Sequence, residues 1–289
     1  MKQAPEWNRE ALLKSPFFTP LHPVLAELES ESFPALGDCN ALLAARTPTI
    51  TVQSGKPLRF MPQECGKLPF EAQYEPRCYL KGEVQTRANN WHDLFNALVW
   101  LTFPKTKAVL NARHYDALTV EGAASGSHRG AVRDVNTLFD ESGVIVVYAD
   151  ANSDIDLAGL LHNFEWKELF WHRREQVMTG MGFYLFGHGL CEKALQPYVG
   201  MTGQGLLIRV EQGFFSLPPA QQLTRLDSLL AAYLAKRDHF RSTRDVSPVP
   251  LLGVPGWAAD NDCAAYYDNA AYFRPGRRGA KTLQERARP

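Results

Sequence analysis

The feature that most constrains this chain is an apolar run at residues 89–103 that contains several polar side chains. It reads NNWHDLFNALVWLTF and is followed by Pro104. Asn89 or Asn90 can cap a helix, and Pro104 either stops that helix or starts the next one. Polar groups inside a buried helix cost free energy unless each is hydrogen-bonded or ligates something. The run is therefore predicted to be a buried helix that carries either a structural polar network or a functional site.

A second helix is predicted at about residues 105–118, and the short connection between the two helices favours an antiparallel pair. On the first helix, His92 and Asn96 are four residues apart and share a face. On the second helix, Asn111 and His114 are three residues apart and also share a face. We expect these two faces to meet.

Two histidines flanked by amides and carboxylates could hold a zinc-like divalent ion, because imidazole suits zinc and catalytic zinc commonly takes three protein ligands. We predict His92 and His114 as metal ligands and Asn96 and Asn111 as ligand-binding groups. The spacing matches no established metal motif such as H-E-x-x-H. The alternative is a buried network in which these side chains satisfy backbone carbonyls. Candidates for the missing ligand are Asp93, Asp116, Asp134, His128 and His188.

A further helix is expected from residue 133, with Arg133, Asn136 and Asp140 on one face. Arg133 is predicted to clamp an anion, because its guanidinium can bind a carboxylate or phosphate through two parallel hydrogen bonds. Asp93 or Asp134 is predicted to serve as a further metal ligand or general base. The alternative for Arg133 is an ion pair with Asp140 or Asp93.

Gly187, His188 and Gly189 precede another predicted helix. The glycines allow close backbone approach, and free N–H groups at a helix start can bind an anion. His188 is therefore predicted to bind a ligand. Cys191 lies near His188 and could form a nucleophile pair with it, although a buried structural cysteine explains the same pattern.

The charge balance argues against general nucleic-acid binding. Lys plus Arg and Asp plus Glu both total 31, so the chain lacks the basic excess typical of such proteins. Residues 166–174 (WKELFWHRR) mix aromatic and basic side chains, which can stack bases and hold phosphates. A helix with its aromatic face inward fits the same pattern. The expected partner is an unidentified small molecule or protein.

The expected compartment is the cytoplasm. The chain contains no uncharged apolar run of about 18 residues, so no membrane span is predicted. Its N-terminus lacks the apolar segment of a signal peptide. Its five cysteines are scattered, with no C-x-x-C pair, which favours reduced thiols.

The predicted fold class is α+β: a mainly helical body with a few short strands in a single domain. Strands are expected at residues 144–148 and 206–210, and a long helix at 220–237. Residues 59–61 and 78–80 are expected to form a loose hairpin. The alternative is a small α/β sheet, since strands and helices alternate between residues 143 and 237. The expected organisation is an arm at 1–20, a globular domain at 21–275 and a basic, frayed tail at 276–289.

Several motifs resemble the DUF3025 family of bacterial proteins. The resemblance covers roughly residues 20–275 and implies one folded unit of bacterial origin. It implies no particular activity. The motifs are residues 90–100 (NWHDLFNALVW), 103–107 (FPKTK), 110–114 (LNARH), 166–171 (WKELFW), 186–190 (FGHGL), 192–195 (EKAL), 197–203 (PYVGMTG) and 253–257 (GVPGW).

Overall fold

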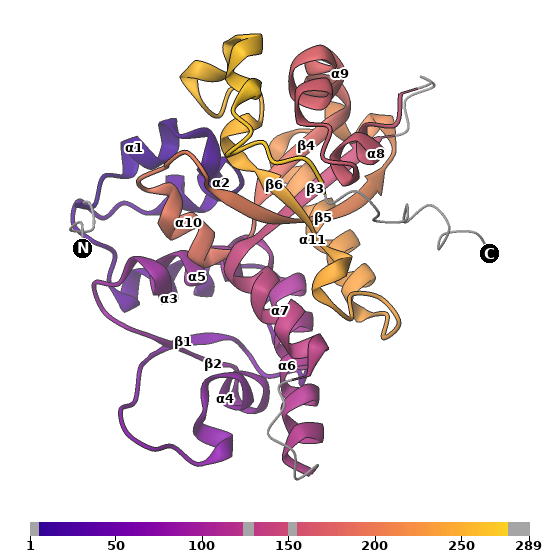
Figure 1. Ribbon diagram of the computed structural model, residues 1–289. Helices are drawn as coiled ribbons and strands as arrows, with labels where there is room; N and C mark the ends of the chain where they lie inside the picture. The colour runs from indigo at the N-terminus through magenta and orange to yellow at the C-terminus, as the bar shows by residue number, and fades with distance from the viewer. Residues whose placement is uncertain (1–5, 124–129, 150–154, 277–289) are drawn as a thin grey trace.

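The computed structural model describes residues 6–123, 130–149 and 155–276. It is mainly helical with a few short strands, which confirms the predicted α+β class (Figure 1). Most of the predicted tail lies outside the described residues, as does His128. The α-helices described are α1 (Arg9–Lys14), α2 (His22–Glu27), α3 (Leu36–Ala44), α4 (Tyr74–Lys81), α5 (Trp91–Thr102), α6 (Pro104–Ala123), α7 (Ala131–Ser142), α8 (Leu157–His162), α9 (Arg174–Gly180), α10 (His188–Ala194) and α11 (Pro219–Ala235).

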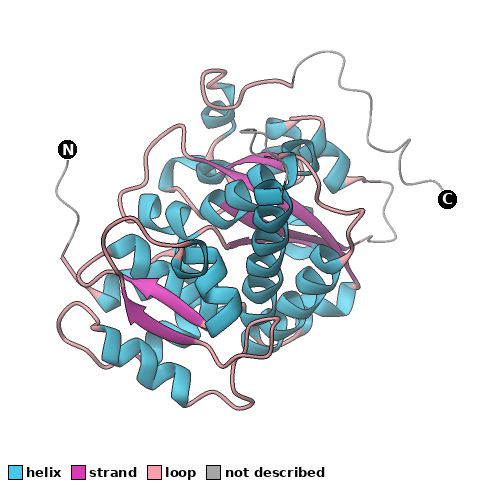
Figure 2. Cartoon of the chain, turned by 90° about the horizontal axis from the view of Figure 1, so that it is seen from below, coloured by secondary structure: helices cyan, strands magenta, loops and turns pink. Residues whose placement is uncertain are grey.

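The strands form two separate sheets (Figure 2). One pairs β1 with β2 in parallel, and the other has the order β4-β3-β5-β6. In the larger sheet β3 is parallel to β5, whereas β4 and β6 are antiparallel to their neighbours, so this sheet is mixed. The strands are β1 (Arg59–Pro62), β2 (Glu83–Thr86), β3 (Gly143–Ala149), β4 (Met181–Leu185), β5 (Thr202–Val210) and β6 (Ser247–Pro250).

One hydrophobic core connects the described parts of the chain, reaching from Leu12 to Phe273. The predicted strands at 144–148 and 206–210 are confirmed as the central pair β3 and β5. Four consecutive β3 residues, 144–147, are fully buried, which is typical of a strand covered on both faces. The long helix predicted at 220–237 is confirmed as α11.

The predicted hairpin between residues 59–61 and 78–80 is wrong. Residues 78–80 belong to α4, and β1 instead pairs in parallel with β2. Parallel strands need a crossover connection, and α4 supplies it. A buried ion pair joins the helix to the strand, with Arg77 Nε 2.5 Å from Glu83 Oε2. Gly82 ends α4 in the left-handed region at φ 72°, a conformation that glycine adopts without steric cost.

The two helices predicted around Pro104 are confirmed as α5 and α6. Asn90 caps α5, because its side-chain oxygen accepts the Asp93 N–H at 3.0 Å. Pro104 begins α6, which continues five residues beyond the predicted end to Ala123. The two helices contact each other.

The start of α6 is capped by a residue far away in the sequence. The carboxylate of Asp227, on α11, accepts the backbone N–H groups of Lys105 at 3.0 Å and Thr106 at 2.8 Å. Asp227 is only 4% exposed, and burial raises the pKa of its carboxyl. This contact satisfies two N–H groups that have no partner within the helix.

We expect Asp227→Ala to lower the free energy of unfolding by about 1–3 kcal/mol, because two N–H donors at the start of α6, one of them buried, lose their acceptor. Asp227→Asn keeps a side-chain carbonyl and should lose less. Urea unfolding followed by circular dichroism measures both. Equal stability of the Ala variant and the parent chain would contradict this role.

Candidate metal centre

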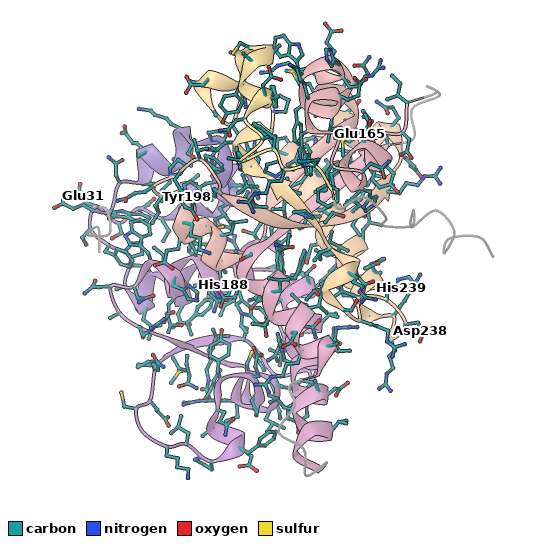
Figure 3. The ribbon with its side chains drawn as sticks, in the orientation of Figure 1. Glu31, Glu165, His188, Tyr198, Asp238 and His239 are labelled. Atoms are coloured by element: carbon teal, nitrogen blue, oxygen red, sulfur yellow. The ribbon has the colours of Figure 1, made fainter. Side chains whose placement is uncertain are left out.

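A cavity of about 660 Å³ lies between α4, α5, α6, α7 and α10, with the loop before α4 on its rim. Its wall combines carboxylates, histidines and amides. Figure 3 shows His188 in the middle of the molecule, where α10 approaches α5 and α7. The lining residues include Tyr74, Glu75, His92, Asp93, Asn96, His114, Asp140, Glu141 and His188.

Three side chains on this wall converge: His92 from α5, Glu141 from α7 and His188 from α10. Their ligand atoms all lie within 4.8 Å of one another. Glu141 Oε1 lies 3.7 Å from His92 Nε2 and 3.6 Å from His188 Nε2. The two imidazole rings meet edge to face, with centroids 4.4 Å apart. In the described ranges, this is the one group of such residues compact enough to hold a metal ion.

Each histidine has a second carboxylate on the opposite side of its ring. His92 Nδ1 lies 3.2 Å from Glu192 Oε2, and His188 Nδ1 lies 3.7 Å from Asp140 Oδ2. A proton held at Nδ1 leaves the lone pair at Nε2, and both Nε2 atoms face Glu141. Histidines that bind metals commonly have a carboxylate on the far nitrogen, which sets the tautomer and the ring orientation. The contact of His92 is within hydrogen-bond distance, whereas that of His188 is longer and its Nδ1 has no hydrogen-bond partner among the described residues.

Asp140 is itself held by a buried cation. Lys107, whose side chain is 4% exposed, places Nζ 2.5 Å from Asp140 Oδ1. Burial acts to raise the pKa of Asp140, but the charge and hydrogen bond of Lys107, together with the nearby imidazoles of His188 and His114, outweigh it, and the pKa is lowered. Asp140 therefore stays ionised behind His188.

The protonation state of His188 suits metal binding. Its side chain is 8% exposed, and burial lowers its pKa to about 3. A neutral imidazole is the form that binds a metal. Burial and the nearby charge of Asp140 raise the pKa of Glu141. A bound cation would therefore stabilise the ionised form of this carboxylate.

Two glycines bring α10 this close to α7. A Cβ at Gly187 would collide with the backbone of residues 141–143, and a Cβ at Gly189 would collide with the Glu141 carboxylate. The Gly187 N–H donates to the Gly143 carbonyl at 2.9 Å. The predicted close backbone approach at these glycines is therefore present, and a carboxylate occupies the space that it creates.

The other predicted residues of α5 and α6 line the cavity or a small pocket beside it, outside the three-residue cluster. Asp93 binds Arg87 through both carboxylate oxygens, at 2.9 and 2.8 Å. Asn96 Nδ2 donates to the Tyr74 hydroxyl at 2.6 Å. His114 is buried on the wall near Asp140.

Asn111 turns toward α4, where its Nδ2 donates to the Glu75 carboxylate at 2.7 Å. Arg133 and Asp134 lie in the first turn of α7 and do not line the cavity. Asp134 precedes Glu141 by seven residues, which is about 10 Å along the helix.

Three groups that surround the histidines were not predicted as site residues: Glu141, Glu192 and Tyr74. The sequence did contain one indication of Glu141: Asp140 and Glu141 are adjacent carboxylates at the end of a predicted helix, just before the predicted buried strand. Glu192 follows His188 by one helical turn, yet it contacts His92 on another helix. Tyr74 belongs to α4, whose helix was not predicted.

The aromatic and basic segment at 166–174 is held within the protein. Trp166 Nε1 donates to the Arg274 carbonyl at 2.9 Å. Arg173 pairs with Glu168 at 2.6 Å, and Arg174 with Asp262 at 2.5 Å. None of the described helices is long and apolar enough to span a membrane.

The fold and the site together define a mainly helical α+β protein with a cluster of two histidines and one carboxylate. The chain belongs to the DUF3025 family, since the model of that family, described as a protein of unknown function, matches residues 58–277. This confirms the resemblance seen in the motifs. No curated protein and no solved structure matches the chain. Function must therefore be inferred from the site itself.

We expect Gly189→Ala to weaken zinc binding roughly tenfold, as loss of a supporting contact around a metal ligand typically does. The added methyl group displaces the Glu141 carboxylate, whose side chain can move without unfolding the protein. Gly187→Ala meets backbone instead, so it should mainly lower stability, by about 1–3 kcal/mol. Competition with a chromophoric chelator gives the zinc affinity, and thermal melting gives the stability. Unchanged affinity in Gly189→Ala would contradict this geometry.

Proposed function

We propose that this protein is a metal-dependent hydrolase whose divalent ion, such as zinc, is bound by His92, His188 and Glu141. The observation that carries the proposal is the convergence of two Nε2 atoms and one carboxylate within 4.8 Å on the wall of a cavity. Two histidines and a glutamate are a common ligand set of catalytic zinc, which keeps its fourth position for water. The cavity provides room for a substrate beside that position.

The chemistry of such a site is the attack of water on a polarised acyl or phosphoryl group. The metal lowers the pKa of bound water to about 7 and stabilises the charge that develops on the substrate oxygen. For an amide, the acyl carbon gains the water oxygen, the C–N bond breaks, and the leaving nitrogen takes a proton. His188 is suited to such a site because it is buried and neutral, and Glu141 because it supplies a negative charge.

His92 was predicted as a metal ligand, and His188 was named among the candidates for the missing one. We assign these two together with Glu141, and we place His114 on the substrate side of the cavity. Asp93 is bound to Arg87, so we give it a positioning role. We assign no catalytic role to Asp134 or Arg133, since neither lines the cavity.

A second candidate function is a non-catalytic binding protein in which the polar helix pair is structural. The hydrogen bonds of Asn96 with Tyr74 and of Asn111 with Glu75 favour that interpretation for the two amides. They do not involve the two histidines of the cluster. The two functions therefore differ in what His92 and His188 do, and metal analysis separates them.

The untagged protein, stripped with a chelator and reloaded with zinc, is expected to retain about one zinc per chain after desalting. His92→Ala, His188→Ala and Glu141→Ala should each lose that zinc, because two protein ligands do not make a stable site. His114→Ala is the matched control: it removes a buried histidine from the same cavity and should keep the metal. Elemental analysis measures the stoichiometry, and circular dichroism checks that each variant is folded.

Two outcomes would contradict the metal site: a parent protein that retains no zinc, or a His114→Ala variant that loses zinc as completely as His188→Ala. A folded, metal-free protein destabilised by His92→Ala would support the structural network instead. Hydrolysis is tested separately with chromogenic anilide, ester and phosphate substrates. Activity that zinc restores after chelation, and that His188→Ala lacks, supports the enzyme.

A further inference from the structure

The carboxylates around the cavity differ in how their charges are balanced. Five line its wall, and three of them are each paired with a basic side chain. Glu141 faces the two histidines of the metal centre. The three ion pairs are Glu64 with Arg77, Asp93 with Arg87, and Asp140 with Lys107.

Glu75 is the fifth carboxylate, and within the described ranges it has no lysine or arginine partner at salt-bridge distance. Its Oε2 accepts one hydrogen bond from Asn111 at 2.7 Å, and its backbone carbonyl accepts another from the same amide at 3.0 Å. A neutral amide orients the carboxylate without balancing its charge. Glu75 therefore presents a fixed, unbalanced negative charge to the cavity.

Buried amide atoms near Glu75 are also left without partners. Asn111 is 4% exposed, and because both of its hydrogen bonds to Glu75 come from Nδ2, its Oδ1 is the atom with none. Asn96, which lines the cavity and is 5% exposed, likewise has an amide oxygen without a hydrogen bond. Buried polar atoms of this kind are uncommon in folded proteins and call for a ligand or an ordered water.

The cations near Glu75 are paired with other carboxylates or exposed. Lys107, which lines the same small pocket as Glu75, is bound to Asp140. Arg87 is bound to Asp93, and Lys67 is an exposed residue of the loop before α4. Tyr74, next to Glu75, accepts a hydrogen bond from Asn96. Burial, followed by the charge of Glu75, raises the pKa of Tyr74 well above its ordinary value. The hydroxyl therefore keeps its proton and can donate a hydrogen bond to a substrate oxygen.

We propose that the substrate carries a primary ammonium group, which Glu75 binds while the scissile bond lies at the metal. This inference rests on the proposed function and names its substrate class: an amide or ester of an amine-bearing compound. An ammonium group supplies three hydrogen-bond donors. The acceptors available to them include the Glu75 carboxylate and the Asn96 amide oxygen, which has no hydrogen bond within the described residues.

The test uses three hydroxamic acids of nearly equal shape, each joining a zinc-binding group to a different tail. The probes are 6-aminohexanohydroxamic acid, heptanohydroxamic acid and the monohydroxamate of pimelic acid, which carry an ammonium, a methyl and a carboxylate. Homologues with shorter and longer tails show which tail length gives the largest preference for the ammonium group. Calorimetric titration of the zinc-loaded full chain gives the three dissociation constants.

We expect the ammonium probe to bind roughly tenfold more tightly than the methyl probe, since a charge-assisted hydrogen bond contributes about that much. The carboxylate probe should bind most weakly. Glu75→Gln should abolish the ammonium preference while keeping the zinc, because Asn111 can still bind a side-chain carbonyl. Glu71→Gln is the matched control: it removes an exposed carboxylate near α4 and should keep the preference.

Equal binding of the three probes, or tightest binding of the carboxylate probe, would overturn the ammonium site and leave the metal-dependent hydrolase intact. A Glu75→Gln variant that keeps the ammonium preference would overturn the site in the same way. Failure of every probe to bind the zinc-loaded chain would instead count against the metal centre itself, and the inference would fall with it.

Discussion

The packing of the start of α10 against the end of α7 is the contact on which the candidate site depends. Gly187 lies on the backbone at the end of α7, and Gly189 lies against the Glu141 carboxylate. Gly143, which begins β3, accepts N–H groups from both Phe186 and Gly187. The junction between a helix and the central sheet therefore holds His188 beside Glu141. Without this close approach, the Glu141 carboxylate and the His188 imidazole would not lie side by side.

Four charged or titratable side chains next to this junction contact one another in series. Lys107 neutralises Asp140, Asp140 stands behind His188, and His188 faces Glu141. Lys107 and Asp140 would each be costly to bury alone. The charge of Asp140 is balanced by Lys107, whereas the Glu141 carboxylate faces the imidazoles of His92 and His188. A divalent ion would complete the pattern, because it supplies positive charge where two imidazole nitrogens and one carboxylate meet.

The sequence predicted those parts of the structure that depend on periodicity within one segment. The apolar run with Asn90 at its start and Pro104 after it predicted α5 and α6, and the β-branched run at 144–147 predicted β3. His92 and His188 were identified as chemically capable groups from their surroundings in the sequence. Spacing along one helix shows which residues share a face, but it does not show which helices meet.

The partners of those residues could not be predicted for this reason. Glu141 joins His188 only through long-range pairing of β3 and β4, which brings the end of α7 to the start of α10. The hydrogen-bond partners of Asn96 and Asn111, Tyr74 and Glu75, lie on α4. That segment is short and polar, and part of it was predicted to form a hairpin. Because α4 was not predicted, the residues that it contributes to the cavity wall were not predicted either.

The central claim is that His92, Glu141 and His188 bind one metal ion together, and anomalous diffraction from crystals of the zinc-loaded protein tests it most directly. We predict a single strong zinc peak at about 2.0–2.2 Å from both Nε2 atoms and a Glu141 oxygen. A map with no peak between these three side chains, or with zinc bound elsewhere on the chain, would contradict it.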